Sequence, residues 1–243
     1  DLSIIIDRLT ELKNQTYNYF TDLKNDDYFS EAMLKCVARG YINGVGNKQL
    51  NPRGNATREE VAVIFCRVFN IDTSYSGSTG FKDDSNISSW ARSSVYALSK
   101  AGYLNGTPDG YVLPKNNITR AELITLLDNF ADTYIPNSKS GSDSGTSGNT
   151  FISNFPKNIV VNKSITLIDS TVGRDIYITK IAGSMSLKNT SIMGRIVCME
   201  STSLNLTDST VAQVVLCNEK STVTGVSDKV YEVYVKEGAT EST

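Results

Sequence analysis

The chain has 243 residues, a formal net charge of −2 and no histidine. This charge balance gives no electrostatic footprint for nucleic acid. The lack of histidine excludes Ser-His-Asp and Cys-His nucleophile systems and histidine-based zinc sites. No apolar stretch approaches the length of a membrane span. The length allows two domains, and the composition fits an exported protein.

The N-terminal segment, residues 1–19, is predicted to be one helix. Its apolar stripe at helical spacing consists of Ile4, Ile5, Leu9 and Leu12. The apolar run is too short, and too soon followed by Asp7, to be a signal peptide. We expect this helix to pack in one core with helices near residues 58–70 and 120–133, which carry similar stripes.

The next part of the chain contains one motif twice, 62 positions apart. The two copies share nine residues at this offset: Gly40-Tyr41-Ile42-Asn43-Gly44, Pro52, Asn55 and Thr57-Arg58-Glu59-Glu60 correspond to Gly102-Tyr103-Leu104-Asn105-Gly106, Pro114, Asn117 and Thr119-Arg120-Ala121-Glu122. Such a repeat indicates one supersecondary unit used twice. In each copy the first glycine is expected to end a helix in a left-handed cap, and the Asn-Gly pair to form a turn.

The end of each copy predicts the start of a helix. Thr57 with Glu60, and Thr119 with Glu122, have the spacing of a capping box, which is a purely structural role. Arg58 and Arg120 lie in the first helical turn, where the helix dipole disfavours a cation. Either these arginines have a second role, or each forms a local ion pair with a nearby glutamate.

These residues resemble the S-layer homology (SLH) domain. The second copy matches the family well, through Phe81-Lys82-Asp83, Trp90-Ala91, Asp109-Gly110 and the signature Ile118-Thr119-Arg120-Ala121-Glu122. The first copy is looser: Phe20-Thr21-Asp22 matches, whereas Tyr28 replaces the tryptophan and the signature reads Ala-Thr-Arg-Glu-Glu. The resemblance assigns residues 19–72 and 80–136 to two SLH repeats. It makes residues 1–19 a helix left from a first repeat.

The resemblance implies both a fold and a function. SLH domains attach exported proteins non-covalently to secondary cell-wall polysaccharide, which often carries pyruvyl groups. They usually occur as three repeats in a pseudo-trimer around a central helical bundle, so an all-α and incomplete module is expected here. The implied location is extracellular, at the cell wall or S-layer of a bacterium.

The glycan-binding residues that the resemblance implies are Arg58, Arg120, Trp90, Tyr103 and Asp83. Arg120 is expected to be the main contact because its repeat retains the whole signature. A guanidinium binds the carboxylate of a pyruvyl ketal bidentately, and an aromatic face packs on the apolar side of a sugar. For Trp90 the structural alternative is an anchor in the core.

The C-terminal part changes in character. Residues 137–150 are rich in serine and glycine and have no apolar side chain until the next segment, which predicts a flexible linker. Residues 151–243 then alternate apolar and polar with a period near 20. The expected columns are Leu167, Leu187 and Leu206; Val172, Ile192 and Val211; Ile176, Ile196 and Val215; and Ile178, Cys198 and Cys217. This pattern favours a short parallel β-helix over a small antiparallel β-sandwich.

The sequence offers no support for catalysis, a cofactor or a metal site. Adjacent carboxylates such as Asp83-Asp84 do not converge on one point of a helix or strand. Cys198 and Cys217 are expected in one inward column of neighbouring coils, as free stacked thiols rather than the alternative disulfide, whose geometry there is poor. Cys36 and Cys66 are expected to be small core residues.

We therefore expect a non-enzymatic surface protein that is anchored to wall polysaccharide by its SLH repeats and displays a β-helical scaffold or adhesion domain. Other surface-layer subunits are further expected partners, whereas nucleic acid is not. One alternative is a polysaccharide-active enzyme that uses the β-domain and keeps the SLH repeats as an anchor. Another is an SLH module that has lost glycan binding and serves only in assembly.

Overall fold

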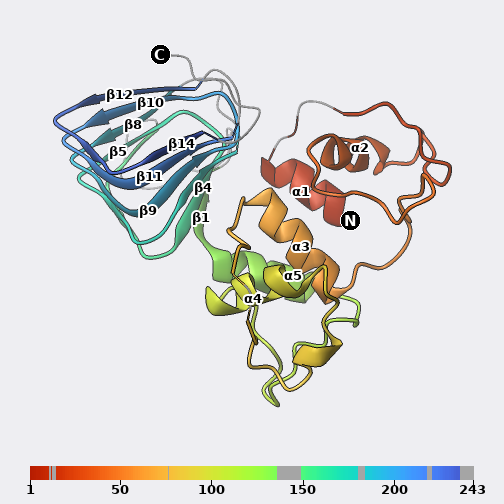
Figure 1. Ribbon diagram of the computed structural model, residues 1–243. Helices are drawn as coiled ribbons and strands as arrows, with labels where there is room; N and C mark the ends of the chain where they lie inside the picture. Colours follow the sequence, from red (N-terminus) through yellow and green to blue (C-terminus); the bar gives the residue numbers. More distant parts are fainter. Residues whose placement is uncertain are drawn as a thin grey trace. The chain divides into compact units, whose positions relative to one another are not determined.

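A computed structural model describes residues 1–10, 12, 15–75, 77–135, 149–179, 184–217 and 221–235. They belong to two compact units, Asp1–Asn129 and Phe130–Thr243. The first unit is helical, and the second is a parallel β-solenoid (Figure 1). The predicted fold class, an all-α module followed by a short parallel β-helix, is confirmed. The antiparallel sandwich is excluded because the strands described in the second unit pair in parallel.

The first unit consists of short helices joined by long loops. The helices are α1 (Leu2–Thr10), α2 (Ser30–Ala38), α3 (Arg58–Val68), the 3-10 helix η1 (Asp84–Asn86), α4 (Arg92–Lys100) and α5 (Arg120–Phe130). As predicted, α2 and α4 end just before glycines in the left-handed region, with φ of 70° at Gly40 and 76° at Gly102. Because only glycine adopts this conformation without a Cβ penalty, the two copies end their first helix in the same way.

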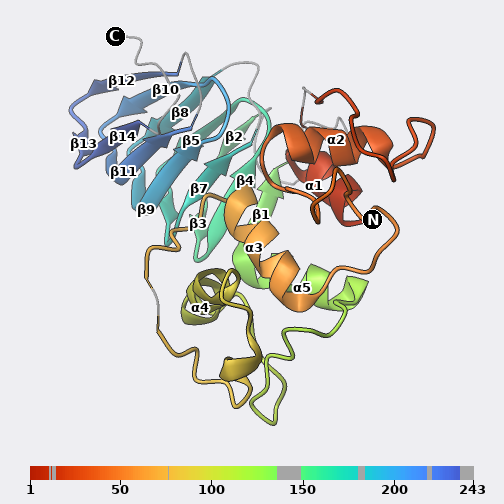
Figure 2. The same cartoon turned by 45° about the vertical axis from the view of Figure 1, so that its right-hand side comes forward.

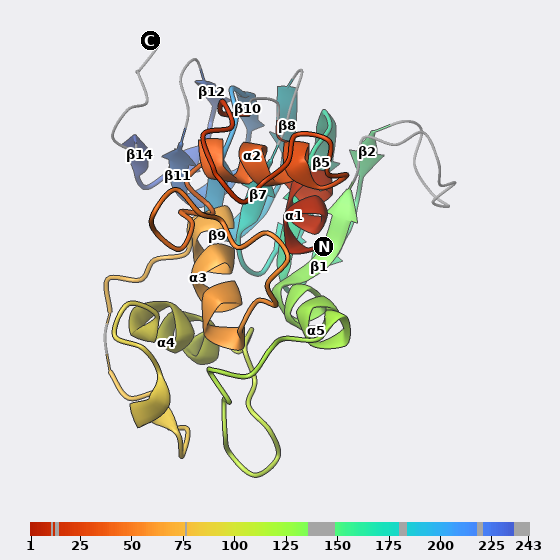
Figure 3. The same cartoon turned by 90° about the vertical axis from the view of Figure 1, so that its right-hand side faces the viewer.

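Two helix boundaries differ from the prediction. Helix α1 ends at Thr10, whose hydroxyl donates to the carbonyl of Ile6, and residues 15–19 are not helical. Helix α5 ends at Phe130, where the chain continues directly as a strand. Helix α1 packs mainly on α2, and α3 on α4 (Figures 2 and 3). The three helices expected to share a core, α1, α3 and α5, all contribute residues to the lining of one cavity.

The second unit is a solenoid of two parallel sheets. Its strands are β1 (Ala131–Ile135), β2 (Thr150–Phe151), β3 (Asn154–Phe155), β4 (Asn158–Val161), β5 (Ile165–Ile168), β6 (Thr171–Val172), β7 (Ile176–Ile178), β8 (Ser184–Lys188), β9 (Ser191–Cys198), β10 (Ser203–Thr207), β11 (Thr210–Leu216), β12 (Thr222–Val226), β13 (Lys229–Val230) and β14 (Val233–Val235). One sheet has the order β12-β10-β8-β5-β2, and the other contains the path β1-β4-β7-β9-β11-β13.

The solenoid begins earlier in the sequence than residue 151. Strand β1 pairs in parallel with β4, so residues 131–135 belong to the solenoid although they precede the predicted linker. Of that linker, only Asn149 and Thr150 lie within the described residues, and Thr150 already begins β2.

Two of the predicted columns are confirmed residue by residue. Leu187 pairs with Leu167 and Leu206, and Ile192 pairs with Val172 and Val211. The side chains of these columns fill one apolar core between the two sheets, in which they are almost fully buried. Like side chains stacked in register therefore hold successive coils together.

The other two predicted columns are wrong by one residue in the third coil. Ile196 pairs with Val214 rather than Val215, and Cys198 pairs with Leu216 rather than Cys217. The cause is a β-bulge, because β9 uses one residue more than β11 between the two paired regions. Gly194 lies in this bulge, and a Cβ atom added to it would lie 2.3 Å from the Oδ1 atom of Asp175.

The register shift also changes the environment of the cysteines. Cys198 faces the core, and burial, together with the nearby Cys217, raises the pKa of its thiol to about 12. Cys217 is only half-buried and lies outside the column of Cys198, so the expected stacking of the two thiols is wrong. Both are free cysteines, as predicted, as are the buried Cys36 and Cys66.

One corner of the solenoid is a ladder of polar residues. Asp169, Asn189 and Asp208 each have a φ between 47° and 50° and stand at equivalent positions of successive coils. The side-chain amide of Asn189 donates to the carboxylate of Asp169 over 2.7 Å. Asparagine and aspartate tolerate the left-handed conformation better than other non-glycine residues, which explains why this column of the sequence is polar.

Candidate functional site

The two signature segments form the capping boxes that their spacing predicts. The Oγ1 atom of Thr57 accepts from the amide of Glu60, and the carboxylate of Glu60 accepts from the amide of Thr57 at 2.7 Å. Thr119 and Glu122 repeat this arrangement at the start of α5, with distances of 3.2 and 2.8 Å. The four residues thus fix where α3 and α5 begin, and each following arginine occupies the first helical position.

Arg58 is held inside the fold by the second copy of the repeat. It is only 8% exposed, and its Nε atom donates to the carbonyl of Val112 at 2.7 Å. Its Nη1 atom donates to the Oε1 atom of Glu122 at 2.6 Å, and Nη2 to the carbonyl of Asn105 at 3.2 Å. The ion pair is therefore not local to one helix, since it joins α3 to the start of α5.

The hydrogen bonds of Glu122 also affect the pKa of its carboxyl group. The backbone hydrogen bond from Thr119 lowers the pKa of the Glu122 carboxyl group, and the Thr119 hydroxyl and the Arg58 guanidinium lower it further. The carboxylate stays charged at neutral pH, so the link between the two copies is a charged one.

Asp83 and Tyr103 are also built into the fold. Asp83 is buried, and its two carboxylate oxygens accept from the amides of Val112 and Leu113 at 2.9 and 2.8 Å. In the first copy Asp22 binds the amides of Leu50 and Asn51 in the same way. Tyr103 is buried as well. Sequence reasoning grouped Asp83 and Tyr103 with the exposed candidates because the linear motif carries no information on burial.

Arg120 and Trp90, by contrast, are exposed and line a common cavity. Their side chains are 77% and 56% exposed, so Trp90 is not a core anchor. The Nη2 and Nε atoms of Arg120 donate to the Oδ2 atom of Asp1 at 2.5 and 3.1 Å. Because both partners are exposed, this ion pair contributes little to stability, and a competing carboxylate can replace Asp1 at the guanidinium.

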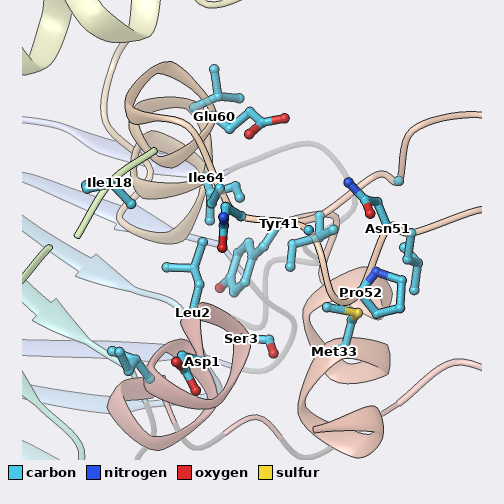
Figure 4. A pocket seen from close by; sticks show the side chains of 18 of the residues that line it. Asp1, Leu2, Ser3, Met33, Tyr41, Asn51, Pro52, Glu60, Ile64 and Ile118 are labelled. Atoms are coloured by element: carbon cyan, nitrogen blue, oxygen red, sulfur yellow. The ribbon is translucent and has the colours of Figure 1, made fainter. Parts of the chain in front are cut away.

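The cavity has a volume of about 460 Å³ and lies within the helical unit, where α1, α3 and the start of α5 meet the loop of the first repeat (Figure 4). Its charged lining residues are Asp1, Glu60, Arg67 and Arg120. Sequence reasoning missed Arg67, whose Nη1 atom donates to the carbonyl of Tyr41 at 3.2 Å. Its counterpart at the 62-residue offset is Asn129, which donates to the carbonyl of Tyr103. Because the two positions carry different residues, the repeat gave no signal for Arg67 in the sequence.

The two repeats described above also match a known protein family. Residues 19–62 and 80–124 match the family model of the S-layer homology domain. The chain carries two SLH domains.

Relatives of this chain share only a small part of their length with it. An amylopullulanase of Thermoanaerobacterium thermosulfurigenes is 36% identical over 132 residues, which are 52% of this chain and 7% of that protein. A cellulosome-anchoring protein of Acetivibrio thermocellus is 34% identical over 99 residues, 39% of this chain and 21% of the relative. S-layer protein EA1 of Bacillus anthracis is 27% identical over 108 residues, 44% of this chain and 12% of the relative. The match thus spans about a fifth or less of these curated relatives.

The solenoid contains a half-buried charged cluster of Asp175 and Arg195. Asp175 accepts from the amide and from the Nε and Nη2 atoms of Arg195, at 2.7 to 3.0 Å, and from the hydroxyl of Tyr177. Burial lowers the pKa of Arg195, but the hydrogen bond and charge of Asp175 outweigh it and raise the pKa above its usual value. Both Asp175 oxygens accept hydrogen bonds, so this carboxylate joins the start of β7 to β9.

Two further observations concern membranes and metals. Among the described residues, none of the helices has the length and hydropathy that a membrane-spanning helix needs. Within the same ranges, no three acidic, cysteine or histidine residues are grouped so that they could hold a metal ion.

Proposed function

We propose that this chain anchors an exported protein to the bacterial cell wall by non-covalent binding of a secondary cell-wall polysaccharide. The observation that carries the proposal is the pair of SLH domains with an exposed signature arginine, Arg120, which lines the same cavity as Trp90. A guanidinium in this setting suits a sugar carboxylate, such as a pyruvyl ketal, because it offers a planar pair of donors. The exposed face of Trp90 suits the apolar side of the same sugar.

The relatives support a location at the cell surface. Two of them are named as a cellulosome-anchoring protein and an S-layer protein, and they are 34% and 27% identical to this chain over 99 and 108 residues. A role in anchoring appears in the first name, and the second refers to the S-layer. The glycan, its pyruvyl groups and any contact with other surface-layer subunits are part of our proposal.

The proposed role of the solenoid is a non-catalytic scaffold or adhesion module. Its half-buried carboxylate, Asp175, is paired with Arg195, and its corner groove, lined by Asp169, Asn189 and Asp208 among others, is built from a regular ladder. The alternative function is a polysaccharide-active enzyme, because some relatives are named as enzymes. This chain matches only 7–12% of the length of those relatives, so their names do not carry an enzymatic role over to it.

Arg120→Ala is expected to weaken binding of the full chain to pyruvylated wall polysaccharide by about 1.5–3 kcal/mol, the range for a charged hydrogen bond. This corresponds to a loss of about 10- to 150-fold in affinity. Binding is measured by titrating purified polysaccharide, with and without its pyruvyl groups, against the wild type and the variant. Arg120→Ala should bind the depyruvylated polymer as well as the wild type does.

The matched control is Arg53→Ala, which removes an arginine that is 70% exposed in the same unit but does not line the cavity. This variant should bind like the wild type. If folded Arg120→Ala bound pyruvylated polysaccharide with unchanged affinity, the proposed site would be wrong. If the wild type bound neither polymer, the module would serve only in assembly.

The non-catalytic role of the solenoid is tested with the full chain. Incubation with a panel of wall and plant polysaccharides should release no new reducing ends and no unsaturated products. Cleavage that is abolished by Asp208→Asn, a substitution of an exposed corner carboxylate, would favour the enzyme alternative. Cleavage that persists in this variant but is lost on substituting another acidic residue of the solenoid would favour it equally.

A further inference from the structure

One face of the solenoid carries two rows of uncharged polar side chains. The rows lie on the outer face of the sheet β12-β10-β8-β5-β2, whose strands run side by side in Figure 1. Along each strand they alternate with buried apolar residues of the core. Strand pairing places Ser184, Ser203 and Thr222 in one row, and Thr150, Thr166, Ser186, Asn205 and Thr224 in the other. We call these two rows the hydroxyl face.

The hydroxyl groups of this face differ from those at the corners of the solenoid. At one corner, Thr190 and Ser209 each donate to the carbonyl of the residue two positions earlier, which stabilises the turn. On the hydroxyl face, the side chains of Thr166, Ser184 and Ser186 have no hydrogen-bond partner among the described residues. Local structure therefore explains the hydroxyl groups at the corner but not those on the face.

Hydrogen bonds between neighbouring coils orient other side chains of the face. The Oγ1 atom of Thr222 donates to the Oγ atom of Ser203 at 3.2 Å, and the Oγ1 atom of Thr224 donates to the Oδ1 atom of Asn205 at 2.8 Å. Asn205 is exposed, and within the described part of the chain its amide nitrogen has no acceptor. Because asparagine is depleted in strands, strand propensity does not account for its place in the middle of β10.

The charge of the face selects a class of ligand. Within the five strands of this sheet, Lys188 at the end of β8 is the only charged residue. An anionic polymer therefore finds no cation in the two rows, and a protein partner finds none of the aromatic or arginine anchors that dominate protein interfaces. A neutral polyhydroxyl ligand fits the face, because hydroxyl and amide side chains offer both donors and acceptors.

The spacing of the face favours an extended polymer. Paired strands place equivalent side chains about 4.8 Å apart along the solenoid axis, and the two rows are roughly 6.6 Å apart along each strand. The first spacing is close to the length of one hexose unit in an extended polysaccharide. Each hydrogen bond to such a chain contributes little by itself, but a chain that crosses four coils forms several at once, and these reinforce one another.

We propose that the hydroxyl face binds a neutral linear polysaccharide, whose chain lies along the solenoid axis across β5, β8, β10 and β12. The side chains of Ser186 and Asn205 lie at the centre of the longer row and contact successive sugar units. The inference rests on the proposed adhesion role of the solenoid and names the class of its ligand. It does not involve Arg120 or the cavity of the helical unit.

The test measures binding of the full chain to three insoluble neutral polymers: amorphous cellulose, mannan and chitin. We expect binding to at least one of them. Ser186→Lys places a charge in the middle of the longer row and should reduce this binding by at least about tenfold, because the ammonium loses its hydration against a neutral ligand. The matched control is Met193→Lys, which adds the same charge at a position of the other sheet that is 66% exposed, and this variant should bind like the wild type.

Asn205→Ala is a milder second variant that removes one hydrogen-bonding group. It should weaken binding by about three- to tenfold, as expected for one neutral hydrogen bond. A wild-type midpoint in urea unfolding shows that each variant is folded. Wild-type protein that binds none of the three polymers, or folded Ser186→Lys and Asn205→Ala variants that bind as the wild type does, would overturn the proposal.

The outcome is separate from that of the wall-binding assay. Ser186→Lys and Asn205→Ala should bind pyruvylated wall polysaccharide with wild-type affinity, because Arg120 belongs to the other compact unit. Loss of wall binding in Arg120→Ala with no binding of neutral polymers by the wild type would refute the hydroxyl face alone. Binding of a neutral polymer that depends on Ser186, in a chain that does not bind the wall, would refute only the wall anchor.

Discussion

Arg58→Ala is expected to lower the free energy of unfolding of the helical unit by about 2–4 kcal/mol, since it removes several hydrogen bonds of a buried charged group at once. The substitution leaves the carbonyls of Asn105 and Val112 without their donor, and Glu122 without its partner. Urea unfolding of the full chain, followed by the fluorescence of Trp90, measures this effect.

The natural control is Arg120→Ala, which removes the arginine at the same position of the other repeat. Because Arg120 is exposed and pairs with an exposed partner, its loss should cost less than about 0.5 kcal/mol. Arg58→Lys should fall between wild type and alanine, because an ammonium keeps the charge but not the planar fork. Equal losses for Arg58→Ala and Arg120→Ala would contradict the structural role assigned to Arg58.

Leu187→Ala should destabilise the solenoid by about 2–5 kcal/mol, the range for truncating a large aliphatic side chain in a core. Leu187 is 1% exposed and lies in the middle of a column between Leu167 and Leu206. Loss of the Leu187 side chain leaves a cavity. The strands cannot move to close it, because β8 is paired in register with β5 on one side and β10 on the other. The measurement is urea unfolding of the full chain, followed by hydrogen exchange of the amides in β5, β8 and β10.

Met193→Ala serves as the comparison for this prediction. Met193 is 66% exposed in the bulge of β9, so removing its side chain should change stability by less than about 0.5 kcal/mol. A similar loss for Leu187→Ala and Met193→Ala would mean that the inward column does not carry the stability of the solenoid.

The repeats made the main elements of the fold predictable from the sequence. The capping spacing of Thr57 and Glu60 locates the start of α3, and Gly40 and Gly102 locate the ends of α2 and α4, because each acts through local backbone chemistry. The register of one sheet could also be predicted, because stacked coils favour like side chains in one column. This column consists of Leu167, Leu187 and Leu206.

Features that depend on non-local packing were not predictable in this way. The bulge in β9 shifts the register by one residue. The run Val214-Val215-Leu216-Cys217 is apolar at every position and fits either alignment, so Cys217 was placed in the wrong column. The end of α5 was set too late because the residues after Phe130 pair with β4, a strand more than twenty positions further along.

The candidate site shows the same limit more clearly. Arg58 and Arg120 occupy identical positions of one motif, yet one is buried by a neighbouring repeat and the other is exposed. The linear pattern identifies both as important but does not say which acceptors surround each of them. Only the three-dimensional arrangement separates the structural arginine from the one available to a ligand.

The link between Arg58 and Glu122 also limits how such proteins recombine. The two residues belong to different repeats as the sequence divides them, and the natural place for a crossover, between residues 62 and 80, lies between them. A chimera joined there takes the arginine from one parent and its three acceptors from the other. We therefore expect a functional chimera only when the Asn105–Val112 loop and the capping glutamate of one parent fit the arginine of the other.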